Sequence, residues 1–190
     1  GATNGDTGSG NVVNGLGNVI IGYDEPRVSD SDKSGSHNLV VGSYHNYTSY
    51  GGIVVGGHNS ITGPYSSVSG GAGNSASGNC SSVCGGVSNQ ASGSHSVVSG
   101  GDRNEAFGEV SSVGGGQFNT ASGQLSSISG GVNNKASGGF TFIGGGGGSF
   151  SEDGNIAVAN YSAILGGVNN LTGDGWADYY SPLERVAQYE

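Results

Sequence analysis

Two histidines are the first candidates for chemistry in this 190-residue chain. They occur in the dipeptides His45-Asn46 and His58-Asn59, at what read as matching places in neighbouring repeats of the sequence. If both imidazoles point outward from adjacent strands they lie about 5 Å apart. Imidazole pairs suit divalent transition metals, so His45 and His58 are candidate metal ligands. The alternative, two ordinary surface histidines, is the preferred interpretation.

An acidic segment precedes these histidines. Asp30-Ser31-Asp32 has a carboxylate spacing compatible with Ca²⁺, and Asp24 and Glu25 add negative charge nearby. The segment lacks the glycine and the terminal glutamate of an EF-hand loop. A solvated acidic loop is therefore favoured over a calcium site, and no other cofactor is expected.

Three tyrosines, Tyr44, Tyr47 and Tyr50, cluster just after the acidic segment. An exposed tyrosine presents a flat apolar ring with a polar tip, which suits the recognition of carbohydrate or protein. The three are therefore candidate ligand-binding residues for a host glycan or a matrix protein. The alternative is that they fill one end of the fold or a subunit interface.

Cys80 and Cys84 are the two cysteines of the chain. On one extended strand their Cα atoms lie about 13 Å apart, whereas a disulfide requires less than about 7 Å. We therefore expect free thiols or links to another chain.

Catalytic motifs are not found in the sequence. It contains no G-x-S-x-G elbow, no P-loop and no H-E-x-x-H motif. The glycine run 144–148 lacks the Lys-Ser/Thr ending of a phosphate loop. The chain is not expected to be an enzyme.

Composition narrows the class of protein further. The net charge is −9, and the five Lys and Arg residues are scattered, so no nucleic-acid partner is expected. No apolar run is long enough to cross a bilayer, so no membrane insertion is expected. There are 42 glycines and only 33% hydrophobic residues, which predicts a thin core of small side chains.

An internal repeat is the strongest signal and must position all these residues. Units such as SVCGGVSNQASG and SVGGGQFNTASG recur with a period of 15 residues, seen in the second glycine of each pair, the asparagines and the alanines. The members are Gly71, Gly86, Gly101, Gly116 and Gly131; Asn74, Asn89, Asn104, Asn119 and Asn134; and Ala76, Ala91, Ala106, Ala121 and Ala136. Upstream steps are near 14 residues.

A unit of this length accommodates two short strands and two tight turns. Because side chains alternate along a strand, each coil places one β-branched residue and one small residue inside. The first interior column is Ile20, Val40, Val54, Val68, Val83, Val98, Val113, Ile128, Ile143 and Ile164; the second is Ile61, the five alanines and Leu171. Stacked asparagines are expected to form amide ladders.

The predicted fold is therefore an all-β parallel β-solenoid of about ten coils of 14–15 residues. Residues 1–173 form the repeat domain, with irregular coils over 12–63, an insertion at 24–35, regular coils over 64–146, an insertion at 147–155 and a last coil over 156–173. Residues 174–190 are predicted to be a cap or a connector.

The S-V-x-G-G-x-x-N-x-A-S-G unit resembles the head repeats of YadA-like trimeric autotransporter adhesins, and similar repeats occur in secreted bacterial proteins and phage fibres. The resemblance covers about residues 12–173 and implies a left-handed β-roll that forms a homotrimer. The chain departs from that pattern in its period of 15 rather than 14, and in a Gly-Gly pair where an apolar residue and a glycine are usual.

The resemblance implies a non-enzymatic module displayed outside the cell, which mediates attachment or spacing and associates with copies of itself. A phage tail-fibre segment is an alternative. An ice-binding solenoid is a further one, although its outer serine rows would be interrupted at Cys84, Phe107 and Gly114. Ligand contacts are expected at the ends of the rod, in 23–50 and in Trp176–Tyr189, because these segments hold the distinctive aromatic residues.

Overall fold

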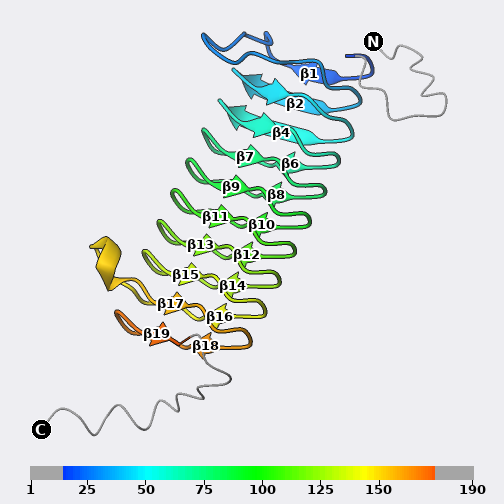
Figure 1. Ribbon diagram of the computed structural model, residues 1–190. Helices are drawn as coiled ribbons and strands as arrows, with labels where there is room; N and C mark the ends of the chain where they lie inside the picture. The colour runs from blue at the N-terminus through cyan, green and yellow to red at the C-terminus, as the bar shows by residue number, and fades with distance from the viewer. Residues whose placement is uncertain (1–14, 174–190) are drawn as a thin grey trace, which may run out of the picture.

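The computed structural model describes residues 15–173, which wind into a rod of stacked turns with two parallel β-sheets (Figure 1). The ten-stranded sheet contains β1 (Val19–Ile21), β2 (Leu39–Ser43), β4 (Ile53–Gly57), β6 (Ser67–Val68), β8 (Ser82–Val83), β10 (Val97–Val98), β12 (Ser112–Val113), β14 (Ser127–Ile128), β16 (Phe142–Ile143) and β18 (Ala163–Ile164). The nine-stranded sheet contains β3 (Asn46–Tyr47), β5 (Ser60–Ile61), β7 (Ser75–Ala76), β9 (Gln90–Ala91), β11 (Glu105–Ala106), β13 (Thr120–Ala121), β15 (Lys135–Ala136), β17 (Ile156–Ala157) and β19 (Leu171–Thr172). The predicted parallel β-solenoid is confirmed, with nine turns that have a strand in each sheet.

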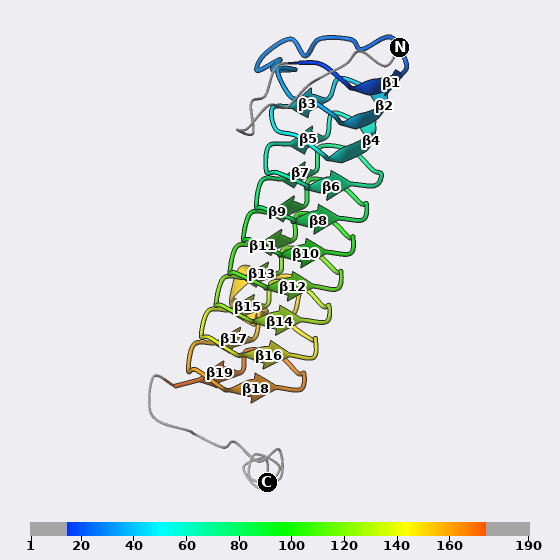
Figure 2. The same ribbon diagram turned by 90° about the vertical axis from the view of Figure 1, so that its right-hand side faces the viewer.

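Each strand pairs with its counterpart in the next turn at the spacing of the sequence repeat. In the regular region Val83 pairs with Val98 and Ala91 pairs with Ala106, both steps of 15 residues. Figure 2 shows the turns from the side, in one continuous stack. The period read from the sequence is therefore the length of one turn.

The change from 14 to 15 residues per turn occurs at one point. Val54 pairs with Val68, a step of 14, whereas Gly57 pairs with Ala72, a step of 15. The added residue is Gly70, between these two points. Strands β2 and β4 of the shorter turns run for five residues, but from β6 onward the strand is cut to two. The extra glycine therefore breaks the strand at this corner.

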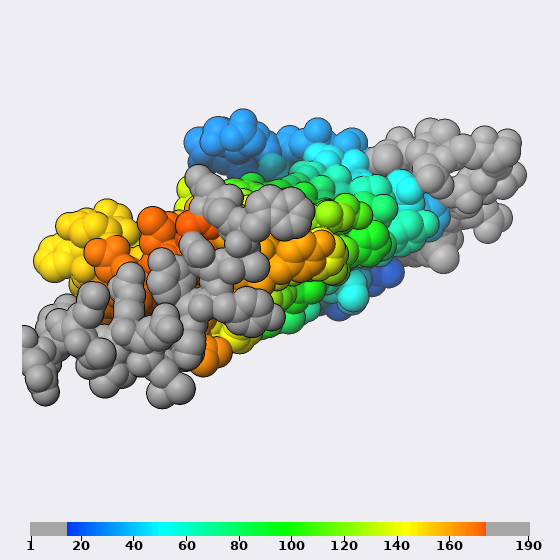
Figure 3. Space-filling model, turned by 60° about the horizontal axis from the view of Figure 1, so that its bottom comes forward, coloured from blue at the N-terminus to red at the C-terminus, as the bar shows by residue number. Residues whose placement is uncertain are grey.

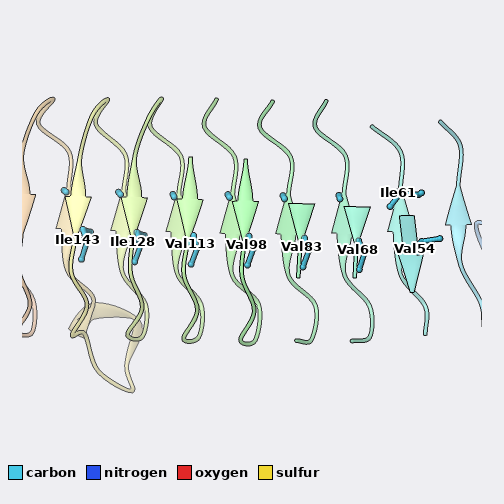
Figure 4. Packing of buried hydrophobic residues seen from close by; sticks show 14 of the residues in the cluster. Val54, Ile61, Val68, Val83, Val98, Val113, Ile128 and Ile143 are labelled. Carbon is cyan, nitrogen blue, oxygen red and sulfur yellow. The ribbon is translucent and has the colours of Figure 1, made fainter. Parts of the chain in front are cut away.

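The core is two columns of side chains, one from each sheet (Figure 4). The Val and Ile column from Val40 to Ile143 and the alanine column from Ala76 to Ala157 are almost completely buried, which confirms most of the predicted interior. In the regular turns one small residue faces one branched residue, so the interior there is closely filled. The first two complete turns instead bury the larger pairs Val40 with Tyr47 and Val54 with Ile61.

Two predicted core positions are wrong. Ile20 is 40% exposed, because β1 is the edge strand of its sheet within the described residues. Leu171 is 55% exposed, and Thr172 is buried in its place and pairs with Ala157. The last turn has one residue fewer between its asparagine and the next glycine. The register follows the asparagine rather than the glycine from which Leu171 was predicted.

A ladder of asparagine side chains closes each turn from β4 onward. Asn104 shows the pattern: its amide donates to the carbonyls of Gly100 in its own turn and Gly116 in the next, each at 2.9 Å. Its Oδ1 accepts the backbone N–H of Asn119 at 3.1 Å. The ladder contains Asn59, Asn74, Asn89, Asn104, Asn119, Asn134, Asn155 and Asn170. Each amide therefore ties one corner to the corner of the following turn.

Glycine is required where the corners of successive turns touch. Gly101 has φ 89°, and a Cβ there would lie 2.1 Å from the carbonyl oxygen of Gly116. At the opposite corner a Cβ on Gly108 would lie 2.0 Å from the oxygen of Gly123. Both distances are shorter than any van der Waals contact, so any side chain would force the turns apart.

Both insertions leave the rod at the corner that follows a strand of the ten-stranded sheet, on the left in Figure 1. The first lies between β1 and β2 and is held by a Lys33–Asp24 ion pair of 2.8 Å. The second contains the 3₁₀ helix η1 (Ser151–Asp153) and projects from the rod in the space-filling view (Figure 3). This second insertion lies within a turn, because β16 begins that turn and β17, after the insertion, completes it. The last turn therefore contains only β18 and β19, and the predicted last coil over 156–173 starts half a turn too early. The predicted cap at 174–190 lies outside the described residues.

The fully buried Ala106 predicts a steric limit on the core. We expect Ala106→Leu to lower stability by about 1–3 kcal/mol, because the added carbons overpack the interior. Thermal unfolding followed by circular dichroism measures the effect. Phe107→Leu, at the neighbouring exposed position, is the matched control and should melt like the wild type. Equal melting temperatures for Ala106→Leu and the wild type would contradict the inward placement.

Asn104→Asp tests the ladder with an isosteric side chain. The carboxylate would face the carbonyl oxygens of Gly100 and Gly116, and an unpaired buried charge costs about 3–5 kcal/mol. We expect a large fall in melting temperature at pH 7, with partial recovery at pH 3, where the carboxyl is protonated. Asn79→Asp, at an exposed corner, should change little. A similar loss in both variants would show that the ladder amide contributes nothing specific.

Candidate interaction surfaces

Tyr47, one of the three predicted ligand-binding tyrosines, belongs to the core. It is 2% exposed and takes the column position that Ile61 and Ala76 occupy in the next turns. Its hydroxyl donates to the Asp24 carboxylate at 3.2 Å. Burial, together with that carboxylate, raises the pKa of Tyr47 to about 12. For Tyr47 the alternative interpretation is therefore correct, namely that the tyrosine fills one end of the fold.

Tyr44 and Tyr50 lie on the surface at different corners of the rod. The Tyr44 ring stacks on the His58 ring, with centroids 4.7 Å apart and planes 14° apart. Tyr50 meets Tyr65 edge to face at 5.1 Å. Because β3 separates the two corners, the three tyrosines do not form one recognition patch. Instead, the surface carries two separate aromatic pairs, Tyr44 with His58 and Tyr50 with Tyr65.

His45 and His58 are not equivalent positions, contrary to the prediction. The register aligns His45 with Asn59, and His45 is buried whereas His58 is exposed. His45 occupies the first position of the asparagine ladder: its Nδ1 accepts the N–H of Asn59 at 3.3 Å, and its Nε2 lies 3.0 Å from the carbonyl of Val41. These contacts require the neutral tautomer with the proton on Nε2. Burial lowers the pKa of His45, and the guanidinium of Arg27 lowers it further.

Asp30 and Asp32 lie in the first insertion and are exposed. The Asp32 carboxylate accepts the N–H of Ser34 at 3.0 Å, and hydrogen bonds from Ser34 lower its pKa. Within residues 15–173, three or more His, Cys, Asp or Glu side chains nowhere group in a way that would hold a metal ion. The predicted pair of outward-pointing imidazoles is not formed, because His45 is buried and His58 is exposed.

Arg27 is a residue that the sequence did not single out. From the first insertion it donates to the carbonyls of Tyr44 at 2.7 Å and Asn59 at 2.9 Å, and also to that of His58. Burial lowers its pKa. The insertion therefore clamps the corners of two successive turns at this end of the rod. A lone arginine in a polar loop gave no signal for this contact.

Cys80 and Cys84 are both exposed, and they form no disulfide with each other. Cys80 lies at a corner with φ 53°, and Cys84 directly follows β8. They belong to the same turn, on the side of the ten-stranded sheet.

The outer face of the ten-stranded sheet carries two rows of residues that flank the buried Val and Ile column. We call it the uncharged face, because its rows contain no Asp, Glu, Lys or Arg among the described residues. One row is Val19, Leu39, Ile53, Ser67, Ser82, Val97, Ser112, Ser127, Phe142 and Ala163; the other is Ile21, Val41, Val55, Ser69, Cys84, Ser99, Gly114, Ser129, Gly144 and Leu165. The face is apolar at both ends and rich in serine in the middle, where Ser112 donates to Ser127 at 2.9 Å.

The outer face of the nine-stranded sheet differs in charge. Glu105 and Lys135 lie on it, with Gln90 and Thr120 in the same row. Phe107 also lies on this face, since it follows β11. It interrupts the serine row of this face, as predicted, whereas Cys84 and Gly114 interrupt a serine row of the other face. The row on this face is Ser77, Ser92, Phe107, Ser122 and Ser137.

A row of non-glycine residues in the left-handed region borders the uncharged face. We call it the corner row: Tyr65, Cys80, His95, Val110, Leu125, Phe140 and Tyr161, with φ between 53° and 61°. This conformation is costly for a bulky or β-branched residue, by about 1–3 kcal/mol. Phe140 and Tyr161 stack with centroids 4.8 Å apart. The chain thus keeps large exposed side chains at a position where glycine would be less strained.

No protein-family model matches the chain, and no curated protein is found to be similar to it. Among the described residues, no helix has the length and apolar character needed to cross a membrane.

The buried imidazole predicts that the start of the ladder is sensitive to acid. His45 has a pKa below the unfolded value of about 6.5, so its contribution to stability is complete above that pH and is lost as the pH falls toward the lowered pKa. Amide exchange at Asn59, whose N–H His45 accepts, should accelerate from pH 8 to pH 5 after correction for intrinsic rates.

His45→Asn should restore the ladder residue and abolish this pH dependence. His95→Asn, at an exposed corner, should leave it unchanged. The role assigned to His45 would be refuted if the corrected exchange at Asn59 in His45→Asn still rose on acidification as in the wild type.

Proposed function

We propose that the chain is a non-enzymatic structural module displayed outside the cell, a rigid rod that mediates attachment or spacing. The observation that carries this proposal is the unbroken asparagine ladder from Asn59 to Asn170, which links every successive turn through side-chain and backbone hydrogen bonds. With ten strands at about 4.8 Å, the rod is about 43 Å long. A stiff array, in which each repeat contacts only the adjacent repeats, is better suited to a spacer than to a catalyst.

The proposed assembly is a left-handed homotrimer, as the likeness of the repeat to YadA-like heads implies. Self-association covers part of the large surface that a thin rod exposes for its small core. A phage fibre segment is an alternative with the same fold, and an ice-binding solenoid is a further one.

Attachment is proposed at the end that carries the first insertion, where Tyr44 and His58 form a stacked pair beside the Arg27 clamp. Exposed aromatic rings and arginine are the usual anchors of recognition. The central turns offer fewer such anchors, namely Phe107 and the Arg103 guanidinium, which lies 5.3 Å from the centre of the Phe118 ring.

Beads that carry the chain test this proposal under flow, over surfaces coated with collagen, mucin or a polysaccharide. We expect the wild type to be retained on at least one coating, and Tyr44→Ala with Tyr50→Ala to reduce retention at least fivefold with unchanged circular dichroism. Tyr47 is left intact, since its loss would open the core.

Tyr161→Ala is the matched control, because Tyr161 is an exposed, stacked aromatic near the other end. It should be retained like the wild type. Attachment would be refuted if wild-type beads were held no better than bare beads on every coating. If Tyr161→Ala lost as much retention as the Tyr44 and Tyr50 variant, the attachment site would not lie at the Tyr44 end.

A further inference from the structure

We infer that the uncharged face, together with the corner row, is where copies of this chain pack side by side in the same direction. The inference rests on the proposed self-associating rod and identifies the surface that it uses. Its first support is the distribution of charge. The chain carries a net charge of −9, yet none of its Asp, Glu, Lys or Arg residues within 15–173 lies on this face or in the corner row. Depletion of charge is the compositional mark of an interface core.

Exposed apolar side chains gather on the same surface. At one end of the face Val19, Ile21 and Ile53 are each more than 40% exposed. At the other end Leu165 is 71% and Tyr161 is 77% exposed. Burial of such side chains against a partner stabilises an assembly, because apolar surface is removed from water.

The backbone of the corner row gives a second, independent reason. Val110, Leu125 and Phe140 adopt φ values of 55–58°, where a β-branched or bulky residue is strained. They are 45%, 41% and 48% exposed, so burial within one chain does not offset the strain. Contact with a second copy supplies the missing burial.

The surface is also free of obstruction and large enough. Both insertions leave the rod at the corner farther from the corner row, so neither crosses the face (Figure 1). A face about 43 Å long and about 15 Å wide offers about 650 Å² from each copy. Two copies then bury about 1,300 Å², within the range of specific interfaces.

The pattern along the face selects a parallel second copy as the occupant. Along the face itself one end is aliphatic, with Leu39 and Ile53, the centre is mostly serine, and the other end combines Phe142 with Leu165. A parallel copy has the same rise per turn and therefore places aliphatic on aliphatic, hydroxyl on hydroxyl and aromatic on aromatic along the whole length. Aromatic pairs gain stability beyond that of their buried area.

The two native cysteines provide the test, because Cys80 lies in the corner row and Cys84 on the face. Two copper(II)-phenanthroline complexes, each reduced to copper(I), take two electrons from two thiols, which release two protons and form one S–S bond. We expect the wild type to form interchain disulfides at least tenfold faster than a variant with Cys80→Ser, Cys84→Ser and Ser92→Cys. Ser92 belongs to the same repeat but lies on the nine-stranded face.

Direction is tested by Ser127→Cys in the background that lacks both native cysteines. In a parallel assembly β14 lies beside β14, so this variant cross-links to itself. In a fully overlapped antiparallel pair β14 lies opposite β4, and cross-linking fails. Failure with Ser127→Cys overturns the parallel arrangement.

A charge placed on the face gives a second measurement. Ser112→Glu should weaken association at least tenfold in sedimentation equilibrium, whereas Ser122→Glu, on the nine-stranded face, should not. A monomeric wild type, or equally fast cross-linking of the Ser92→Cys variant, overturns the inference. Bead retention uses the immobilised chain and does not require this interface, so retention by a monomer would leave the proposed attachment intact.

Discussion

The side-chain amide of one asparagine per turn is the interaction on which the rest of the structure depends. In the regular turns the interior offers only a Val or Ile and an Ala, which is too little apolar surface to hold a 15-residue loop in one shape. The amide of Asn104 supplies what the core lacks, because it satisfies carbonyls of its own corner and of the next one at once. Glycine at these corners follows from that arrangement, since turns tied so closely leave no space for a Cβ.

The ladder contact also explains where the rod tolerates a different number of residues in a turn. The step from Asn134 to Asn155 is 21 residues instead of 15, yet Asn155 still bonds to Asn134 and Gly145 as a ladder member. The first turns lack the extra glycine at Gly70, yet Asn59 keeps its bonds to Val55 and Gly71. The length between two ladder residues can vary, because it is the ladder contact rather than the residue count that sets the register.

This also separates what the sequence could predict from what it could not. The exact repeats gave the parallel stack, the buried columns and the ladder, because one pattern seen five times defines the turn. The irregular ends were harder. His45 was compared with His58 through the adjacent His-Asn dipeptides, whereas its true counterpart is Asn59. A histidine in place of asparagine hides the ladder, and the shift by one residue moved Tyr47 from the expected surface into the core. The Arg27 contacts join an irregular loop to backbone carbonyls, for which a sequence has no pattern.

The segregation of charge adds information that neither the repeat nor the ladder requires. The ladder would form equally well with Glu or Lys on either outer face, and the nine-stranded face does carry Glu105 and Lys135. A glycine in the corner row would relieve the strain at Val110 and Leu125 without disturbing a single ladder bond. Apolar residues at strained, exposed positions beside an uncharged sheet are therefore not explained by the stability of the single chain. The proposed contact with a second rod of the same rise per turn would bury these residues in every turn of the stack.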